Sequence, residues 1–342
     1  MQAFLKYGER PFEAGLRDVT LREPNPEEVL VRVAGCGICG SDLHAFRASS
    51  GYEWVNPPVI LGHEFAGQVE FVPAGVDDVK PGDPVVVIGI QGCGGCRFCR
   101  SGDTHLCMGR KVIGLDFDGG MAAKAWVNRR HLILLPESID LVKAAMLEPI
   151  SVAVHALAQV DVRPGMKIVV SGPGPIGLLC ASLAAKGGAA VLLCGTSADE
   201  DLRLPTARSL GLMVASIGEA PYPALIEECF GSESAPDLWI EASGSVEAFR
   251  AAIGLLRRGG TFLAVGMYDR DFPFFASAAV RAELQLQFSY ASAYRDYATA
   301  LDLLQQGALP LDALAQPVPM ARADEVFRAA VAGRMLKPIL IP

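Results

Sequence analysis

Residues 169–179 read VVSGPGPIGLL, an apolar run followed by three glycines in the spacing G-x-G-x-x-G. Glycines with this spacing permit a tight turn and let the backbone and the N-terminus of the next helix approach a pyrophosphate. A glycine-rich turn without a ligand is the alternative, but the position between an apolar strand and a helix favours a dinucleotide. We therefore predict cofactor contacts from Gly172, Gly174, Pro175, Ile176 and Gly177.

Around this loop, the pattern of residues 152–290 alternates short apolar runs with segments of helical length. Such alternation predicts βαβ units around a parallel sheet, and the near-continuous apolar strands are typical of a sheet covered on both faces. Residues 1–151 differ, because β-type runs cut by turns predict an irregular antiparallel domain there. We predict two further helical stretches, near residues 293–306 and 322–332.

Composition narrows the class of protein further. The 342 residues include 30 basic and 38 acidic side chains, giving a net charge of −8, with no basic run that would indicate nucleic acid or a membrane surface. The apolar segment around the glycine loop is interrupted well before a membrane span is reached. No export signal is recognised at the N-terminus, so we expect a cytoplasmic protein, in which clustered cysteines favour metal over disulfides.

The strongest metal pattern is GCGGCRFCRSGDTHLC at residues 92–107, with the spacing C-x2-C-x2-C-x7-C. Four thiolates on a tight loop suit a closed, tetrahedral zinc site that organises a short lobe, here about residues 91–109. Unconnected or disulfide-paired cysteines are the alternative that this spacing disfavours. The predicted structural zinc ligands are Cys93, Cys96, Cys99 and Cys107.

A second metal pattern is spread along the chain. Cys39 ends an apolar strand that also holds Cys36, and His63 and Glu64 begin another, so the three side chains can meet across neighbouring segments. A thiolate and an imidazole are half of a catalytic zinc site, although each residue alone is more often a packing or surface residue. Glu148, before a proline at a predicted helix start and at the boundary between the expected domains, is a further candidate ligand. Cys36 is predicted to pack on the opposite face of the strand.

With these residues in place, the sequence resembles the zinc-dependent medium-chain dehydrogenases of the alcohol and polyol dehydrogenase family. The resemblance covers essentially the whole chain, and Glu148 places it near the sorbitol (iditol) dehydrogenase branch. It implies a Rossmann domain inserted in a GroES-like catalytic domain formed by residues 1–151 and 291–342. It also implies a homodimer or homotetramer.

The resemblance also implies the residue roles. Cys39 and His63 would bind the catalytic zinc, with Glu64 and Glu148 as acidic residues around it, directly or through water. Ser41 and His44 would form a proton relay, since a hydroxyl both donates and accepts and histidine titrates near neutrality. Zinc would lower the pKa of a secondary alcohol, which then gives hydride to nicotinamide, and the reverse is ketone reduction.

The identity of the dinucleotide depends on the end of the second strand of the predicted parallel sheet. An acidic residue usually stands there to bind the ribose of NAD, but this chain has Thr196 and Ser197, with Arg203 nearby. These groups suit the 2′-phosphate of NADP, whereas one of the acids at 199–201 could turn back to the ribose of NAD. We favour NADP. Further predicted cofactor contacts are Ser243, in EASGS, and Val265, in TFLAVG.

The substrate follows less directly. The resemblance implies an aromatic residue after the relay histidine and an arginine before Tyr290, where this chain has Ala45 and Ser289. We therefore expect, instead of sorbitol, a less hydroxylated diol, a cyclic polyol or aminocyclitol, or a hydroxy-ketone. The alternatives are a zinc-independent enoyl or quinone reductase and a non-catalytic nucleotide-binding zinc protein. Cys39, His63 and Glu148 argue against the first, and Ser41 and His44 against the second.

Overall fold

The computed structural model describes residues 1–232 and 234–342. The chain divides into two compact units, which are described separately. Unit 1 comprises Met1–Pro149 and Ala293–Pro342, and unit 2 comprises Ile150–Ser292. Among the described residues, no helix combines the length and the apolar character that crossing a membrane requires.

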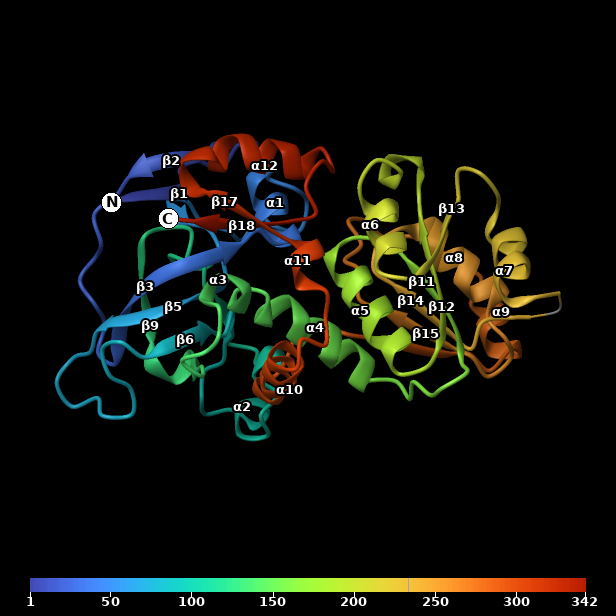
Figure 1. The fold of residues 1–342 in the computed structure, drawn as a ribbon, viewed down its shortest axis with the longest axis horizontal. Coiled ribbons are helices and arrows are strands. Elements are labelled where there is room, and N and C mark those ends of the chain that lie inside the picture. Colours follow the sequence, from blue (N-terminus) through green and yellow to red (C-terminus); the bar gives the residue numbers. More distant parts are fainter. Residues whose placement is uncertain (233) are drawn as a thin grey trace. The chain divides into compact units, whose positions relative to one another are not determined.

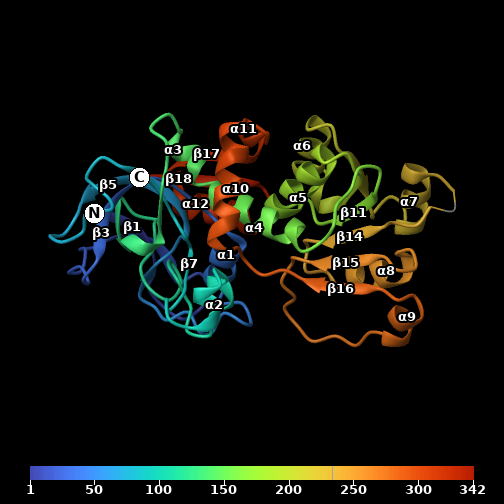
Figure 2. The same ribbon diagram turned by 90° about the horizontal axis from the view of Figure 1, so that it is seen from below.

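Unit 2 is a doubly wound α/β domain (Figure 1). Its six-stranded parallel sheet has the order β13-β12-β11-β14-β15-β16, the strand order of a Rossmann fold. Figure 2 shows α5 and α6 on one side of the sheet and α7 and α8 on the other. Its elements are β11 (Lys167–Ser171), α5 (Pro175–Lys186), β12 (Ala190–Gly195), η3 (Ser197–Asp199), α6 (Arg203–Ser209), β13 (Met213–Ser216), α7 (Tyr222–Phe230), β14 (Leu238–Glu241), α8 (Val246–Leu255), β15 (Thr261–Ala264), α9 (Ala276–Arg281) and β16 (Gln285–Phe288).

Burial explains the apolar strands of unit 2. In β12 the residues from Val191 to Gly195 are all buried, and in β14 all four residues are buried. A strand covered by helices on both faces has no side for polar residues, which is why these strands do not alternate. The predicted Rossmann sheet is therefore confirmed, and its strand ends bring the candidate cofactor residues to one edge.

Unit 1 contains a seven-stranded sheet, a three-stranded sheet of order β2-β1-β4, and the pair β7-β8. Its strands are β1 (Gln2–Lys6), β2 (Ala14–Asp18), β3 (Glu28–Gly37), β4 (Val59–Ile60), β5 (Glu64–Phe71), β6 (Pro84–Val87), β7 (Ile90–Gln91), β8 (Lys111–Val112), β9 (Lys124–Asn128), β10 (Leu132–Leu134), β17 (Ala315–Pro319) and β18 (Lys337–Ile341). All pairs are antiparallel except β17 with β18, so the predicted antiparallel character holds.

Most helices of unit 1 are short, and the longer ones, α10 and α12, lie in its C-terminal segment. They are α1 (Gly40–Phe46), α2 (Arg97–Arg100), η1 (Thr104–Leu106), η2 (Arg129–His131), α3 (Leu141–Ala144), α10 (Tyr294–Gln305), α11 (Leu311–Leu314), η4 (Met320–Arg322) and α12 (Ala323–Val331), while α4 (Leu147–Ala158) runs from unit 1 into unit 2. The helices expected near residues 293–306 and 322–332 correspond to α10 and α12.

Strand β3 is the centre of unit 1. It pairs with β5 and β9, and its last residues pair with β18, so that Gly37 lies opposite Ile339. Sequence analysis placed Cys39 on the same strand as Cys36, but the strand ends at Gly37 and Cys39 is the N-cap of α1. The strand therefore delivers Cys39 to a helix start, where its side chain is not constrained by the alternation of a sheet.

Candidate metal and nucleotide sites

One candidate metal centre lies where α1 and β5 begin. The ligand atoms of Cys39, His63 and Glu64 all lie within 4.8 Å of one another. Cys39 caps α1, and His63 and Glu64 stand at the start of β5, which pairs with the end of β3. A thiolate, an imidazole and a carboxylate at this separation suit a zinc ion. The structure thus brings together three of the predicted residues.

Asp42 orients this cluster and was missed in the sequence. It is fully buried, and its carboxylate accepts hydrogen bonds from the backbone N–H of Cys39 at 2.8 Å and of Gly62 at 3.2 Å. The same carboxylate lies 3.8 Å from His63 Nδ1, while His63 Nε2 faces Ser41 Oγ at 3.4 Å. A carboxylate behind one ring nitrogen directs the other nitrogen toward a metal. The signal in the sequence was an acidic residue three positions after Cys39, the spacing of a capping box.

The electrostatic field of this cluster is negative. Burial lowers the pKa of His63, but the neighbouring Asp42 and Cys39 outweigh burial and raise that pKa well above its ordinary value. Burial also lowers the pKa of the buried Lys337, and Glu64 and Cys39 again reverse the effect and raise it. Both pKa values are raised by the same cause, the acidic side chains gathered at this site, Asp42, Glu64 and Glu148, together with Cys39. A metal dication would be stabilised by the same field.

Lys337 is the second residue that sequence analysis missed. Its ammonium group forms an ion pair with Glu64 Oε2 inside the protein, where the two side chains are 3% and 1% exposed. It also donates a hydrogen bond to the carbonyl oxygen of Ile38 at 3.2 Å. Lys337 begins β18, so the pairing of β18 with β3 delivers it to the site. One oxygen of Glu64 contacts the lysine, which leaves Oε1 for another cation.

Glu148 lies in the first turn of α4 and is also buried. Burial and the neighbouring Glu64 raise the pKa of Glu148 to about 7. His63 and Lys337 oppose this rise, which shows that Glu148 belongs to the same charged group. It is nevertheless outside the set of three whose ligand atoms lie within 4.8 Å.

The two predicted relay residues both lie on α1. Ser41 Oγ lies 3.4 Å from His63 Nε2, directly at the metal cluster. His44 occupies the last turn of α1, and its ring stacks on that of Tyr52 with 4.9 Å between the ring centroids. Cys36, in contrast, is fully buried, and burial raises the pKa of its thiol well above the ordinary value. The structure therefore places Cys36 in the packing of the sheet, as expected.

The four cysteines of the lobe also converge, with their sulfur atoms within 4.8 Å of one another. Cys99 Sγ lies 3.9 Å from Cys93 Sγ and 3.6 Å from Cys96 Sγ, too far for a disulfide, and all nine cysteines of the chain are free. Backbone N–H groups of Gly95 and Cys96 lower the pKa of Cys93 to about 6, favouring its thiolate. Four thiols around one point satisfy the donor set of a closed zinc site.

The glycine loop of unit 2 is built as its spacing predicts. Gly172 has φ +97°, and a Cβ there would lie 2.8 Å from the Ser243 Cβ. A Cβ on Gly177 would lie 1.9 Å from the Gly172 carbonyl oxygen, so only glycine allows this helix to pack against the strand. Gly174 is the N-cap of α5, and a Cβ there would meet nothing within 4 Å. The N-terminus of α5 is therefore open to a ligand.

The remaining predicted cofactor residues lie after β12, β14 and β15, with Arg203 at the start of α6. Asp199 Oδ2 accepts hydrogen bonds from Thr196 N at 2.9 Å and Thr196 Oγ1 at 3.0 Å, and Asp199 Oδ1 accepts one from Arg203 Nη1 at 3.1 Å. The buried Glu241 accepts a hydrogen bond from Ser243 N at 2.7 Å, and its carbonyl accepts one from Val265 N at 2.8 Å. Thr196, Ser243 and Val265 thus lie at the carboxyl ends of the parallel strands, and Arg203 joins them through its hydrogen bond to Asp199.

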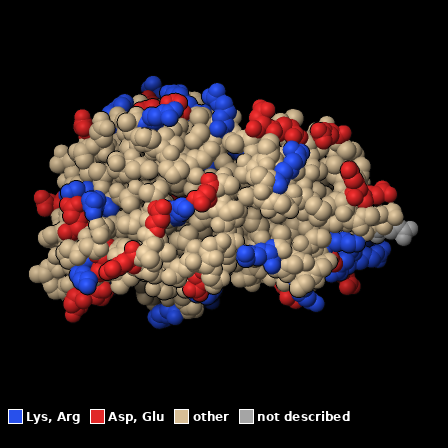
Figure 3. Space-filling model, in the orientation of Figure 1, with Lys and Arg blue, Asp and Glu red and all other residues tan. Residues whose placement is uncertain are grey.

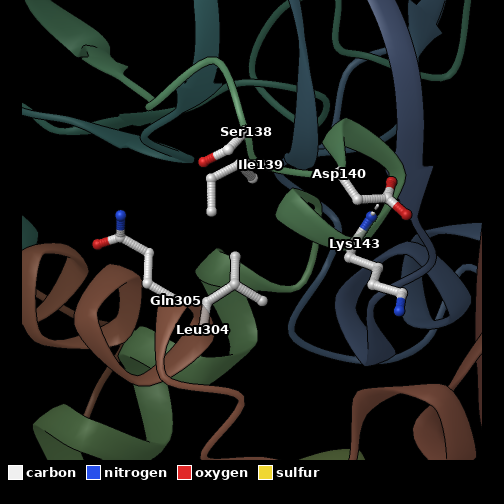
Figure 4. Close-up of a pocket in the computed structure, with 6 residues that line it drawn as sticks. All are labelled: Ser138, Ile139, Asp140, Lys143, Leu304 and Gln305. Atoms are coloured by element: carbon white, nitrogen blue, oxygen red, sulfur yellow. Dashed lines mark hydrogen bonds between the residues drawn. The ribbon is translucent and has the colours of Figure 1, made fainter.

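A surface pocket of about 300 Å³ lies elsewhere in unit 1. Figure 4 shows its lining, formed by Ser138, Ile139, Asp140, Lys143, Leu304 and Gln305. The carboxylate of Asp140 caps α3, and Lys143 pairs with Asp312 at 2.6 Å, so both charged side chains already have partners. On the face drawn in Figure 3, acidic and basic side chains occur in small mixed groups, without a single basic patch.

A Rossmann sheet with an open glycine loop, together with a half-buried cysteine beside a buried histidine and a buried carboxylate, defines a metal-dependent oxidoreductase that uses a dinucleotide. The comparisons agree. Residues 25–137 match the alcohol dehydrogenase GroES-like domain, and residues 175–306 match the zinc-binding dehydrogenase family. The chain therefore belongs to the zinc-dependent medium-chain alcohol and polyol dehydrogenases, and it is an oxidoreductase of polyols or other secondary alcohols.

Named relatives and solved structures support this membership. The chain is 33% identical to a sorbitol dehydrogenase from Halalkalibacterium halodurans, covering 94% of each chain. It is 33% identical to a D-arabitol-phosphate dehydrogenase from Enterococcus avium, covering 94% of this chain and 92% of that one. A zinc-binding dehydrogenase from Sinorhizobium meliloti 1021 bound to NADP has a TM-score of 0.88 and 28% identity, covering 100% of this chain and 99% of that one. The cofactor of this chain is accordingly a nicotinamide dinucleotide.

Proposed function

We propose that the protein interconverts a secondary alcohol of the diol, polyol or cyclitol type and its ketone, with unit 1 as the catalytic domain and unit 2 as the dinucleotide-binding domain. The observation that carries this proposal is the convergence of Cys39, His63 and Glu64 within 4.8 Å. A zinc-independent reductase would not need a thiol beside a buried imidazole and a buried carboxylate in a negative field. In our proposal these three residues hold zinc, and Glu148 stands beside it.

The residues around the proposed zinc have separate roles in the reaction. Zinc held there would supply Lewis acidity that lowers the pKa of a bound secondary alcohol. Ser41, 3.4 Å from His63 Nε2, is placed to accept the hydroxyl proton of the substrate and to donate its own proton onward. His44 would take that proton and release it to solvent. Asp42 lies behind the His63 ring, 3.8 Å from Nδ1, and Lys337 forms an ion pair with Glu64.

The second proposed zinc, held by Cys93, Cys96, Cys99 and Cys107, is structural. Four protein thiolates complete a tetrahedral site and leave no position for substrate. The basic side chains Arg97, Arg100, Arg110 and Lys111 surround these cysteines in the sequence and offset the negative charge of a zinc ion with four thiolates. Asp103 in the same lobe pairs with Arg295 of α10 at 2.9 Å, which attaches the lobe to the rest of unit 1.

We further propose that NADP(H) is the preferred cofactor. Both oxygens of Asp199 already accept hydrogen bonds from Thr196 and Arg203, so this carboxylate is engaged and does not offer the free pair of oxygens that ribose hydroxyls require. Thr196 and Ser197 are exposed hydroxyls beside it. The groups left for the 2′ position are therefore mainly donors, which suit a phosphate.

For assembly we propose a homodimer or homotetramer. Strand β16 is an edge strand of the sheet of unit 2, and Phe288 on it is 62% exposed, with Val280 of α9 74% exposed. An open strand edge with large exposed apolar side chains is a site for association. For location we propose the cytoplasm, where a reducing environment keeps all nine cysteines free.

The test uses purified, zinc-loaded protein. NADPH and NADH are titrated by fluorescence, and secondary alcohols, diols, polyols and cyclitols are then assayed with the cofactor that binds more tightly. We expect turnover that a zinc chelator removes and that added zinc restores, and no turnover in Cys39→Ser. Turnover that persists after chelation and in Cys39→Ser would contradict a metal-dependent reaction.

A further inference from the structure

The carboxyl end of β13 carries a buried hydroxyl group that no hydrogen bond explains. Ser216 is the last residue of this strand and is 1% exposed. Its Oγ is buried and has no hydrogen-bond partner among the described residues. A buried hydroxyl without a partner costs free energy, and such a group in a native structure calls for an explanation. A ligand oxygen is one partner that the protein alone does not contain.

Three short distances place this hydroxyl beside the loop that follows β12. Gly195, at the end of β12, is the register partner of Ser216, and its carbonyl accepts a hydrogen bond from Ile217 N at 2.9 Å. A Cβ built on Gly218 would lie 3.6 Å from Ser216 Oγ and 3.6 Å from Ser197 Cβ. Ser197 and Ser216 therefore face the same point, next to Gly218. That point lies at the ends of β12 and β13. In the sheet, β12 is next to β11, which carries the glycine loop, and the adenosine end of a bound dinucleotide extends in this direction.

A cation near the end of β12, Arg203, has only part of its hydrogen-bonding capacity satisfied. Arg203 donates one hydrogen bond to Asp199, but its Nε is buried and has no partner among the described residues. Asp199 in turn is held by Thr196, so the arginine is fixed at the same loop as Ser197. The other acidic residue there, Glu200, lies 3.9 Å from Arg208. The buried groups without a hydrogen-bond partner at this loop are two donors, Ser216 Oγ and Arg203 Nε, and one acceptor, Glu200 Oε1. A phosphate monoester accepts from both donors, and the pairing of Glu200 with Arg208 offsets the charge of that carboxylate.

We propose that Ser216 donates a hydrogen bond to the 2′-phosphate of NADP(H), and that Arg203, positioned by Asp199, contacts the same phosphate. This inference rests on the proposed use of NADP(H) by unit 2. Ser216 is then a specificity residue: its hydroxyl is satisfied by the phosphorylated cofactor and remains without a partner when NAD(H) binds. Ser216 carries no recognisable signal in the sequence, because it acts through strand register, whereas Asp199 is placed by the local capping box that begins at Thr196.

The experiment measures binding rather than turnover. Dissociation constants of NADPH, NADH, 2′,5′-ADP and 5′-AMP are determined by fluorescence or calorimetry for the zinc-loaded wild type and for Ser216→Ala. Because a hydrogen bond to a charged group is being removed, we expect about tenfold weaker binding of NADPH and 2′,5′-ADP. Binding of NADH and 5′-AMP should change less than about twofold.

Ser182→Ala is the matched control. Ser182 lies on α5 of the same unit and also has a buried Oγ without a partner, but it stands within a helix rather than at a strand end. We expect it to leave all four dissociation constants unchanged. An equal loss for NADPH and NADH in Ser216→Ala, or no loss for either, would overturn the inference.

Gly218→Ala provides a second test that does not depend on the serine. The added methyl group would make only ordinary contacts, with no atom nearer than 3.6 Å, so the fold should tolerate it. The same methyl group would occupy the point that Ser197 and Ser216 face, and it should weaken NADPH binding selectively. Unchanged NADPH affinity would contradict the proposed position of the phosphate. Wild-type protein that binds NADH but not NADPH would overturn this inference alone, whereas binding of neither would also contradict the proposed function.

Discussion

Asp42 Oδ1 lies 3.8 Å from His63 Nδ1, and both side chains are buried. The same carboxylate accepts a hydrogen bond from the N–H of Cys39. One side chain therefore fixes both the histidine and the backbone of the cysteine that we propose as zinc ligands. The geometry of the metal centre depends on a residue that does not itself contact the metal.

Replacing Asp42 should test this dependence. In Asp42→Asn the charge behind His63 is lost while the shape is nearly kept, and the affinity for catalytic zinc should fall about 10- to 100-fold. Zinc competition with a coloured chelator measures the change. Asp140→Asn is the control, because Asp140 caps α3 without contacting the cluster. Zinc affinity equal to that of the wild type would refute an orienting role for Asp42.

The two zinc sites should respond differently to cysteine replacement. Cys39→Ser should lose about one zinc per chain and all turnover, with a small change in melting temperature, because α1 retains its other contacts. Cys107→Ser should instead lower the melting temperature strongly, since the lobe of residues 91–109 contains few buried residues of its own. Metal analysis and calorimetry distinguish the two outcomes. Equal loss of fold in both variants would contradict the division into catalytic and structural sites.

Lys337→Met should destabilise unit 1 considerably. It leaves the carboxylate of Glu64 buried without its cation, which costs about 3–5 kcal/mol of unfolding free energy. Arg322→Met is the control, because its pair with Glu325 is exposed and should contribute less than about 1 kcal/mol. Denaturant unfolding gives both values. The double variant Lys337→Met/Glu64→Gln should recover part of the loss, and no recovery would mean that lysine packing dominates.

Acidification should destabilise the protein through His131. Burial, assisted by Arg130, lowers the pKa of His131 to about 4 from the ordinary 6.5. The unfolded chain therefore binds a proton first as pH falls, so this stabilisation is complete above pH 6.5 and is lost between pH 6.5 and pH 4. Between pH 7 and pH 5 the loss is about 2 kcal/mol. Urea unfolding should show a flatter pH dependence in His131→Gln, and identical slopes would refute the prediction.

Cofactor preference should change when Asp199 loses its charge. In Asp199→Asn an amide can still accept from Thr196, but it no longer neutralises Arg203. Because Asp199 positions the arginine, the loss of this ion pair should misplace the cation, and the dissociation constant of NADPH should rise several-fold relative to that of NADH. Fluorescence titration with both cofactors measures the ratio. A ratio that moves toward NADPH would contradict a positioning role for Asp199.

Local sequence spacing was sufficient to predict much of the molecule. The glycine loop and the cysteine lobe are formed by residues close together in the chain, and their geometry follows from spacing alone. Lys337 could not be found in this way, because it reaches Ile38 across 299 positions through the pairing of β18 with β3. Ser216 escaped notice for a similar reason: a serine at a strand end is ordinary until the register of β12 and β13 is known.

The position of Cys39 shows another limit. Apolar alternation predicts a strand up to the cysteine, but it does not show where the chain leaves the sheet. The capping hydrogen bond from Cys39 N–H to Asp42 sets the start of α1. The spacing of apolar residues along the sequence cannot reveal a single hydrogen bond of this kind.

Because unit 2 is inserted between the two segments of unit 1, it is synthesised before unit 1 is complete. Ile150–Ser292 is synthesised in one continuous piece before Ala293–Pro342 appears, so its sheet can close while β3 still lacks β18. Cys39, His63 and Glu64 are already present in the nascent chain at that stage, without the lysine that later balances Glu64. Zinc held there, as we propose, would have access to the carboxylate of Glu64 before Lys337 is synthesised, and β18 would then dock against a centre whose charge is already balanced.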